Sequence, residues 1–177
     1  MSTVNALTID VEDYFHVSAF ADRIAARDWS GFESRVVQNT QRLLRLLDKH
    51  NVRATCFVLG WVAEQHPQLV RDIASAGHEI GCHSYWHRLV YDLTPDEFRE
   101  DTARSRDVLE EIIGNRVTQY RAPSFSITNR SLWAFDISIR FATIATGSPV
   151  QTRIRTLSRH RPAKWSSSRV PSAESPG

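Results

Sequence analysis

The chain has 177 residues, of which 41% are hydrophobic and 24% are charged, as is typical of a single globular domain with its own hydrophobic core. No apolar run reaches the ~20 residues that a membrane-spanning helix needs, and residues 1–10 lack the pattern of a secretory signal. The two cysteines, Cys56 and Cys82, are too few for a disulfide framework, so we expect a cytoplasmic location.

Charge is distributed unevenly along the chain. Residues 1–137 contain 15 Lys and Arg against 19 Asp and Glu, whereas residues 138–177 contain 7 basic residues against Glu174 alone. The second segment is rich in Arg, Ser and Pro and lacks periodic apolar positions, so we expect a domain over 1–137 followed by a disordered or non-native tail. A basic tail is also compatible with nucleic acid, which leaves a nucleic-acid-binding α/β domain as an alternative.

The predicted elements alternate between strands and helices. In chain order they are a strand over Ala6–Asp10, a helix over Arg35–His50, a strand over Ala54–Leu59, a helix opened by Pro67 and closed by Gly77, a strand over Glu79–Cys82, a helix from the capping box Thr94–Glu97 to about Gly114, a strand over Val117–Arg121, and a helix starting over Asn129–Phe135. This order predicts a parallel sheet with helical crossovers. Ligands of such folds gather at the carboxyl ends of the strands.

Two histidines follow the third predicted strand, four residues apart. On a helix or helical turn the rings of His83 and His87 share one face and can reach a single metal ion. Solvated or packed histidines are the alternative, because such a pair also arises by chance. Cys82 points away from its neighbour on a strand, so we expect a buried free thiol. The remaining histidines have no partner at ligand spacing and are interpreted as structural or exposed: His16, His50, His66, His78 and His160.

Three carboxylates follow the first predicted strand. Asp10 and Glu12 share one side of the strand, whereas Asp13 needs a turn or bulge to join them. One carboxylate can complete a two-histidine, one-carboxylate metal site, and a second can take a proton from water. The alternative is a solvated acidic turn or a helix cap.

An arginine ends the fourth predicted strand, in the sequence Arg121-Ala122-Pro123. The proline holds the preceding residue extended, which stiffens this backbone. At a strand end Arg121 can hold a catalytic carboxylate in place. Taken alone, it is more simply interpreted as a surface residue with a packed stem.

In chain order, these three groups resemble the polysaccharide deacetylase family (NodB homology, similar to carbohydrate esterase family 4). The resemblance spans about residues 5–136 and rests on Leu7–His16, Ala54–Gly60, the His-Ser-x-x-His sequence after Gly81, and Arg-x-Pro. Its first segment, Leu7–His16, is similar to the sequences of the branch of this family that is found in exopolysaccharide gene clusters. The resemblance implies a distorted (β/α) barrel, here incomplete, and a divalent metal, often zinc. It also implies hydrolysis of N-acetyl groups on an amino-sugar polysaccharide or oligosaccharide, with no nucleic-acid partner.

The resemblance further implies roles for single residues. His83 and His87 match the histidine ligands of the metal. Asp10 matches the general base, and Arg121 matches the arginine that orients this base. These roles come from the family pattern and not from the spacing of the residues.

The sequence departs from the family pattern at two places. Val11 stands where the commonest pattern has the carboxylate ligand, so Glu12 is the nearest substitute and Asp13 the reserve. The family takes the proton for the leaving amine from a histidine in a Leu-x-His motif nearer the C-terminus. This sequence has no such motif, and His160 is a poor match. An inactive metal-binding fragment is therefore the alternative to a deacetylase.

The family sequence would continue after Asp136 with a Phe-Arg-Tyr-Asp-Ser-like stretch. Residues 141–145 instead read Phe-Ala-Thr-Ile-Ala, and one coding of them contains Arg-Tyr-Asp-Ser in another frame. We hypothesise that a frameshift replaced the C-terminal part. Resequencing of the gene tests the hypothesis, which an intact upstream frame without homologous coding downstream would contradict.

Overall fold

A single sheet of six strands organises the fold, seen in a computed structural model that describes residues 6–131, 133–134, 143–146 and 153–156. The strands are β1 (Thr8–Val11), β2 (Thr55–Val58), β3 (Glu79–Cys82), β4 (Gln119–Arg121), β5 (Thr143–Thr146) and β6 (Arg153–Thr156). They lie side by side in chain order, parallel from β1 to β5, with β6 antiparallel to β5. The predicted α/β fold with a parallel sheet is therefore confirmed. Among the described strands β1 and β6 are the two edges, so this part of the fold is an open sheet.

The α-helices whose bounds the structure describes are α1 (Val36–Lys49), α2 (Gly60–Gln65), α3 (Pro67–Ser75) and α4 (Pro95–Ile113). The last three pack against one another, and α3 and α4 also contact β3. The predicted capping box is present, because Thr94 Oγ1 accepts the Glu97 N–H while the Glu97 carboxylate accepts the Thr94 N–H. No helix among the described residues has both the length and the apolar character needed to cross a membrane.

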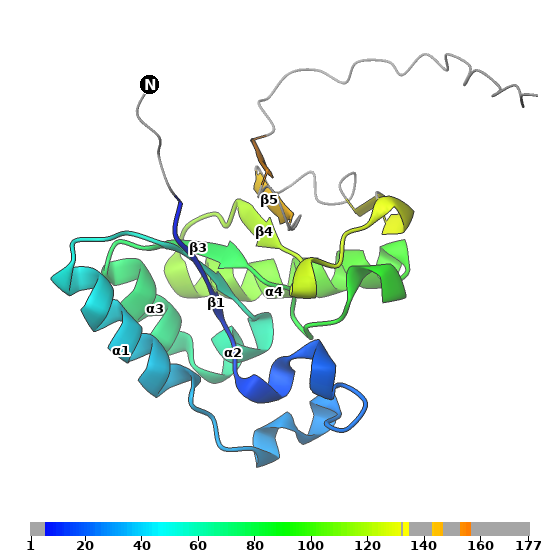
Figure 1. Ribbon diagram of the computed structural model, residues 1–177, viewed down its shortest axis with the longest axis horizontal. Helices are drawn as coiled ribbons and strands as arrows, with labels where there is room; N and C mark the ends of the chain where they lie inside the picture. Colours follow the sequence, from blue (N-terminus) through cyan, green and yellow to red (C-terminus); the bar gives the residue numbers. More distant parts are fainter. Residues whose placement is uncertain (1–5, 132, 135–142, 147–152, 157–177) are drawn as a thin grey trace, which may run out of the picture.

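Six short 3₁₀ turns complete the described structure: η1 (Tyr14–His16), η2 (Ser18–Phe20), η3 (Ala26–Gly31), η4 (Val90–Asp92), η5 (Pro123–Phe125) and η6 (Asn129–Ser131). The first three fill the connection between β1 and α1, and Figure 1 shows them in blue at the carboxyl end of β1. The sequence predicted no element there. Runs of three to six residues have no hydrophobic period that a pattern can detect.

The core lies between the sheet and its helices. Strands β2 and β3 supply buried apolar side chains in succession, as expected for parallel strands covered on both faces. Helices α2, α3 and α4 bury Val62, Ile73 and Leu109 against them. Both cysteines are free and buried, and burial raises each thiol pKa to about 12. The expectation of a buried, unbridged Cys82 is confirmed.

Several boundaries differ from the sequence-based prediction. Strand β1 starts two residues later and ends one residue later than predicted, at Val11, so Asp10 lies within the strand and not at its end. The predicted helix over Asn129–Phe135 is seen as η6 followed by helical residues 133–134, and residues 132 and 135 lie outside the described part. Within the tail expected to be disordered, β5 and β6 join the sheet. The rest of the tail, including His160, lies outside the described residues.

Candidate metal centre

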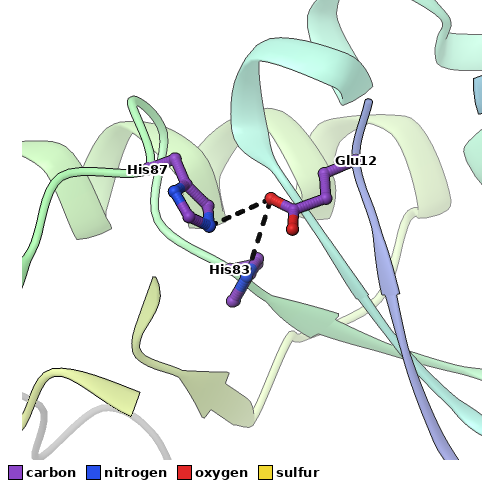
Figure 2. A group of neighbouring side chains, drawn as sticks. All are labelled: Glu12, His83 and His87. Atoms are coloured by element: carbon purple, nitrogen blue, oxygen red, sulfur yellow. Dashed lines mark ion pairs between the residues drawn. The ribbon is translucent and has the colours of Figure 1, made fainter. Parts of the chain in front are cut away.

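Three side chains converge where β1 and β3 end. Glu12 follows β1, and His83 and His87 follow β3. Figure 2 shows both imidazole rings turned toward the Glu12 carboxylate. Glu12 Oε2 lies 3.0 Å from His87 Nε2 and 4.0 Å from His83 Nε2, and one ligand atom from each residue lies within 4.8 Å of the others. The spacing predicted that the two histidines meet, and they do.

The two histidines meet on a loop and not on a helix. Residues 83–87, called here the histidine loop, are non-helical. Within it, Ser84 and His87 have left-handed backbones, with φ of 68° and 54°. Such conformations cost roughly 1–2 kcal/mol each for residues with a side chain. The helical-face argument therefore gave the right pair for the wrong reason, and neighbouring structure must hold the loop in place.

A buried carboxylate on α4 binds the backbone of this loop. Asp101 Oδ2 accepts hydrogen bonds from Ser84 Oγ at 2.6 Å and from the Tyr85 N–H at 2.9 Å. Its Oδ1 accepts the Trp86 N–H at 3.0 Å. Asp101 is only 7% exposed, so these are charge-assisted bonds away from water. Sequence reasoning missed this residue, because an acid on a helix is most often a solvated one.

A second contact packs the start of α2 against the same loop. The Gly60 N–H and the Ser105 hydroxyl both donate to the Ser84 carbonyl, at 2.8 and 2.9 Å. A Cβ at residue 60 would lie 2.7 Å from both Ser105 Oγ and the Tyr85 ring, closer than atoms can approach. Glycine at this position therefore lets the start of α2, helix α4 and the histidine loop pack against one another.

The hydrogen bond of His83 through Nδ1 orients its other nitrogen, Nε2, toward Asp10 and Glu12. Its Nδ1 lies 2.9 Å from the Arg121 carbonyl oxygen, and a carbonyl only accepts, so Nδ1 carries the proton. Burial lowers the His83 pKa, although Asp10 and Glu12 oppose this effect, so the ring is neutral. The Nε2 lone pair then faces two carboxylates, at 4.0 Å from Asp10 Oδ2 and from Glu12 Oε2.

This concentration of lone pairs fits a cation. Glu12 Oε2 is buried, and its nearest described partner is His87 Nε2, at 3.0 Å. Burial raises the Glu12 pKa, but the hydrogen bond and charge of His87, followed by the charge of His83, lower it further, so the net pKa is lowered. Two imidazoles, one of them fixed through its other nitrogen, and one carboxylate are a donor set typical of divalent transition metals.

Asp10 lies beside this cluster and is bound by Arg121. The Arg121 guanidinium donates to Asp10 Oδ1 at 2.6 Å and also to the Thr8 hydroxyl. Arg121 is buried, with its guanidinium carbon 4.2 Å from the centre of the Phe57 ring. The interpretation as a surface residue is therefore wrong, because strand pairing places β4 inside the sheet, where the arginine needs a carboxylate partner.

Asp13, the reserve ligand, is directed elsewhere. Its carboxylate accepts the backbone N–H groups of Arg35 and Val36, at 2.9 and 3.3 Å, and the Ser34 hydroxyl at 2.7 Å. These bonds satisfy donors at the start of α1, as a helix-capping acid does. The structure brings Glu12, and not Asp13, to the histidines.

His16 is buried among aromatic rings near the cluster. The Asp13 N–H donates to its Nδ1 at 2.8 Å, and its ring lies 4.4 Å from that of Trp29 and 5.1 Å from that of Trp61. Burial lowers the His16 pKa to about 4, against the opposing charges of Glu12 and Asp13. Spacing alone left this residue unplaced, because its neighbours come from distant parts of the sequence.

Comparison with known proteins shows the family to which the sequence is similar. The family model described as polysaccharide deacetylase matches residues 29–136. A peptidoglycan-N-acetylglucosamine deacetylase of Bacillus cereus is 36% identical over 96 residues, covering 54% of this chain and 35% of that protein. A chitooligosaccharide deacetylase of Sinorhizobium fredii is 30% identical over 103 residues, covering 55% of this chain and 43% of that protein. The chain thus spans less than half the length of these relatives.

Solved structures give the same fold. The Bc1960 peptidoglycan N-acetylglucosamine deacetylase superposes with a TM-score of 0.58 at 28% identity, covering 78% of this chain and 54% of that one. A CE4 family pseudoenzyme from Bacillus anthracis gives the same TM-score at 24% identity, covering 78% and 41%. The second likeness concerns the fold alone. The sheet described above matches part of these barrel structures.

Proposed function

We propose that this chain, which belongs to the polysaccharide deacetylase family, removes N-acetyl groups from an amino-sugar polysaccharide by metal-dependent hydrolysis. Its ligands for the metal are Glu12, His83 and His87, with Asp10 as base and Arg121 as the residue that orients it. The observation that carries the proposal is the convergence of Glu12 Oε2 with two imidazole nitrogens, beside an Asp10 that Arg121 already binds.

The metal ion, Asp10 and Arg121 have different roles in the proposed reaction. A divalent ion, for which we propose zinc, polarises the acetamide carbonyl when bound and lowers the pKa of water at the site. Asp10 Oδ2 lies on the same side as His83 Nε2, at 4.0 Å, which suits it to take a proton from that water. Arg121 holds the other oxygen, Oδ1, at 2.6 Å, so the direction of the carboxylate is fixed.

The leaving amine needs a proton for the reaction to balance. Relatives in the family take it from a Leu-x-His histidine, and this sequence has no such motif. Asp10, once it has accepted the proton of the attacking water, is the acid among the described residues placed to return it. The alternative, a chain that binds metal without turnover, is favoured by the missing motif alone.

The substrate is proposed from the chemistry of the site and from the relatives. The two relatives named above act on peptidoglycan N-acetylglucosamine and on chitooligosaccharide, which share an N-acetylated amino sugar. The run Leu7–His16 resembles the branch found in exopolysaccharide gene clusters, so we propose an exopolysaccharide as the polymer. Poly-N-acetylglucosamine and peptidoglycan are the two substrates to compare.

Acetate release tests the proposal. Purified protein is treated with EDTA and then assayed with N-acetylglucosamine oligomers and with peptidoglycan, with and without added Zn²⁺. We expect release that depends on the metal and falls to background in His83→Ala. His50→Ala is the matched control, because His50 is exposed and lies outside the cluster.

Two outcomes contradict different parts of the proposal. Zinc binding by the wild type without acetate release from either substrate supports the non-catalytic alternative. Unchanged release in His83→Ala overturns the assignment of the site itself, whatever the substrate.

A further inference from the structure

A cavity of about 420 Å³ lies beside the metal centre, with His87 in its wall. Residues from 15–29, in η1, η2, η3 and the segment between η2 and η3, form one side, and residues from 86–92 form the other. A volume of this size falls within the range of small-ligand sites. Most of the first side lies before residue 29, outside the part of the chain that the family model matches.

Two side chains in this wall carry N–H groups without an acceptor. His16 and Trp29 are 3% and 4% exposed, and no described residue accepts a hydrogen bond from His16 Nε2 or Trp29 Nε1. The Asp13 N–H donates to His16 Nδ1, so in the neutral ring the proton is on Nε2. Buried donors normally have a partner, and two such exceptions in one wall, with ring centres 4.4 Å apart, call for an oxygen from outside the described residues.

The remaining walls restrict the chemistry of the occupant. Trp86, which is partly exposed, supplies aromatic surface that can pack against the C–H face of a sugar ring. Asp22 and Asp92 are exposed residues in the lining, and no described side chain donates to their carboxylates. These carboxylates accept hydrogen bonds from hydroxyl groups and disfavour an anion. Arg88 also lines the cavity, but its guanidinium donates to Glu97 at 3.1 Å. A neutral ligand with hydroxyls and a carbonyl oxygen therefore suits these groups.

We propose that this cavity binds a second N-acetylated sugar unit of the substrate, with its amide carbonyl oxygen accepting from His16 Nε2–H and Trp29 Nε1–H. This subsite deepens the proposed function and rests on it for the identity of the polymer. A carbonyl oxygen has two lone pairs and no proton of its own, so it suits two donors better than a hydroxyl does. A small turn of either ring, common on binding, directs its N–H into the cavity.

The occupant is a neighbouring unit and not the one that reacts. The reacting acetamide must lie between Asp10 and the three proposed ligands. Of these four residues, only His87 also lines the cavity. The enzyme would therefore select polymers in which a unit close to the reacting one keeps its acetyl group.

Binding to the metal-free chain tests the subsite separately from catalysis. Isothermal titration of EDTA-treated protein compares a trimer of N-acetylglucosamine with a trimer of glucose, which has hydroxyls in place of the acetamides. We expect the acetylated trimer to bind at least about tenfold more tightly, and Trp29→Phe to weaken it by about fivefold while leaving the glucose trimer unchanged. Trp133→Phe is the matched control, because Trp133 packs on Phe98 and lies outside the cavity wall.

The outcomes separate the subsite from the enzyme. Equal affinity for the two trimers in the wild type overturns the subsite, even if acetate is released. Selective binding without acetate release keeps the subsite and removes the proposed function. His16→Phe, which removes the N–H, serves as the second variant if Trp29→Phe fails to fold. An unchanged preference for the acetylated trimer in either folded variant overturns the role of these two donors.

Discussion

Replacement of Asp101 by asparagine should release the histidine loop without altering a proposed ligand. The substitution keeps the shape of the side chain but leaves one oxygen and one NH₂ group. If the oxygen continues to serve Ser84 Oγ and the Tyr85 N–H, the NH₂ group faces the Trp86 N–H, donor against donor. One backbone donor then loses its partner, and the two remaining bonds lose their charge.

The size of the effect follows from these bonds. An unsatisfied buried donor costs about 1–3 kcal/mol, and loss of charge assistance costs roughly 0.5–1 kcal/mol for each remaining bond, about 3 kcal/mol in all. The left-handed backbones of Ser84 and His87 cost a similar amount. Without the Asp101 carboxylate the loop is no longer held, and we expect metal affinity to fall by about 10-fold to 100-fold.

Titration of the metal-free protein with Co²⁺ or Zn²⁺ measures this change. The ligand field bands of Co²⁺ report the ligands directly, and calorimetry gives the dissociation constant for Zn²⁺. Asp107→Asn is the control, since it makes the same change on an exposed face of the same helix, where the carboxylate accepts from Arg106. Folding of both variants is checked by thermal unfolding.

One result would refute the reasoning. If folded Asp101→Asn binds Zn²⁺ within twofold of the wild type, the carboxylate does not position the ligands and the loop is stable by itself. A fall in affinity of the same size in Asp107→Asn would likewise remove the argument, because it would show a general effect of charge.

Three further predictions follow from the same contacts. Arg121→Lys keeps the charge but loses the planar guanidinium that binds Asp10 and Thr8 together. The kcat for acetate release should therefore fall by about 10-fold or more, with KM little changed. A variant with the wild-type kcat would contradict this prediction. Burial lowers the His16 pKa from 6.5 to about 4. The neutral ring therefore contributes about 3 kcal/mol to the free energy of unfolding above pH 6.5, and this contribution is lost as the pH falls toward 4. Between pH 7 and pH 5, urea unfolding should show a smaller loss of stability in His16→Phe than in the wild type. Because burial raises the pKa of Cys56 and of Cys82 to about 12, neither thiol should react with a thiol reagent at pH 8 until the chain is unfolded in guanidinium, and rapid labelling of the folded protein would be the contrary result.

Helices and strands were predictable where particular residues mark their first or last position. Pro67 and Gly77 bracket α3, and the capping box at Thr94 marks the start of α4. Strands β1 to β4 were placed within two residues, because buried parallel strands are short apolar runs, whereas β5 and β6 were not predicted. The three turns of residues 14–31 were not predictable, since aromatic contacts between distant residues, and not a period, determine them.

The proposed ligands were predictable only as a set in chain order. Spacing brought His83 and His87 together, yet the helical surface that justified the pairing does not exist. The choice between Glu12 and Asp13 needed the structure, because it depends on which acid satisfies the backbone at the start of α1. Asp101 and His16 carry no local signal, because their roles come from partners far away in the sequence.

The close packing at Gly60 also restricts how this protein can change over generations. Residue 60 touches Ser105 and Tyr85 at once, so a larger side chain there is tolerated only if one of those two residues has already become smaller. Substitutions at the three positions are therefore not independent. Their order matters, and a lineage that enlarges residue 60 first displaces the loop that holds both histidines.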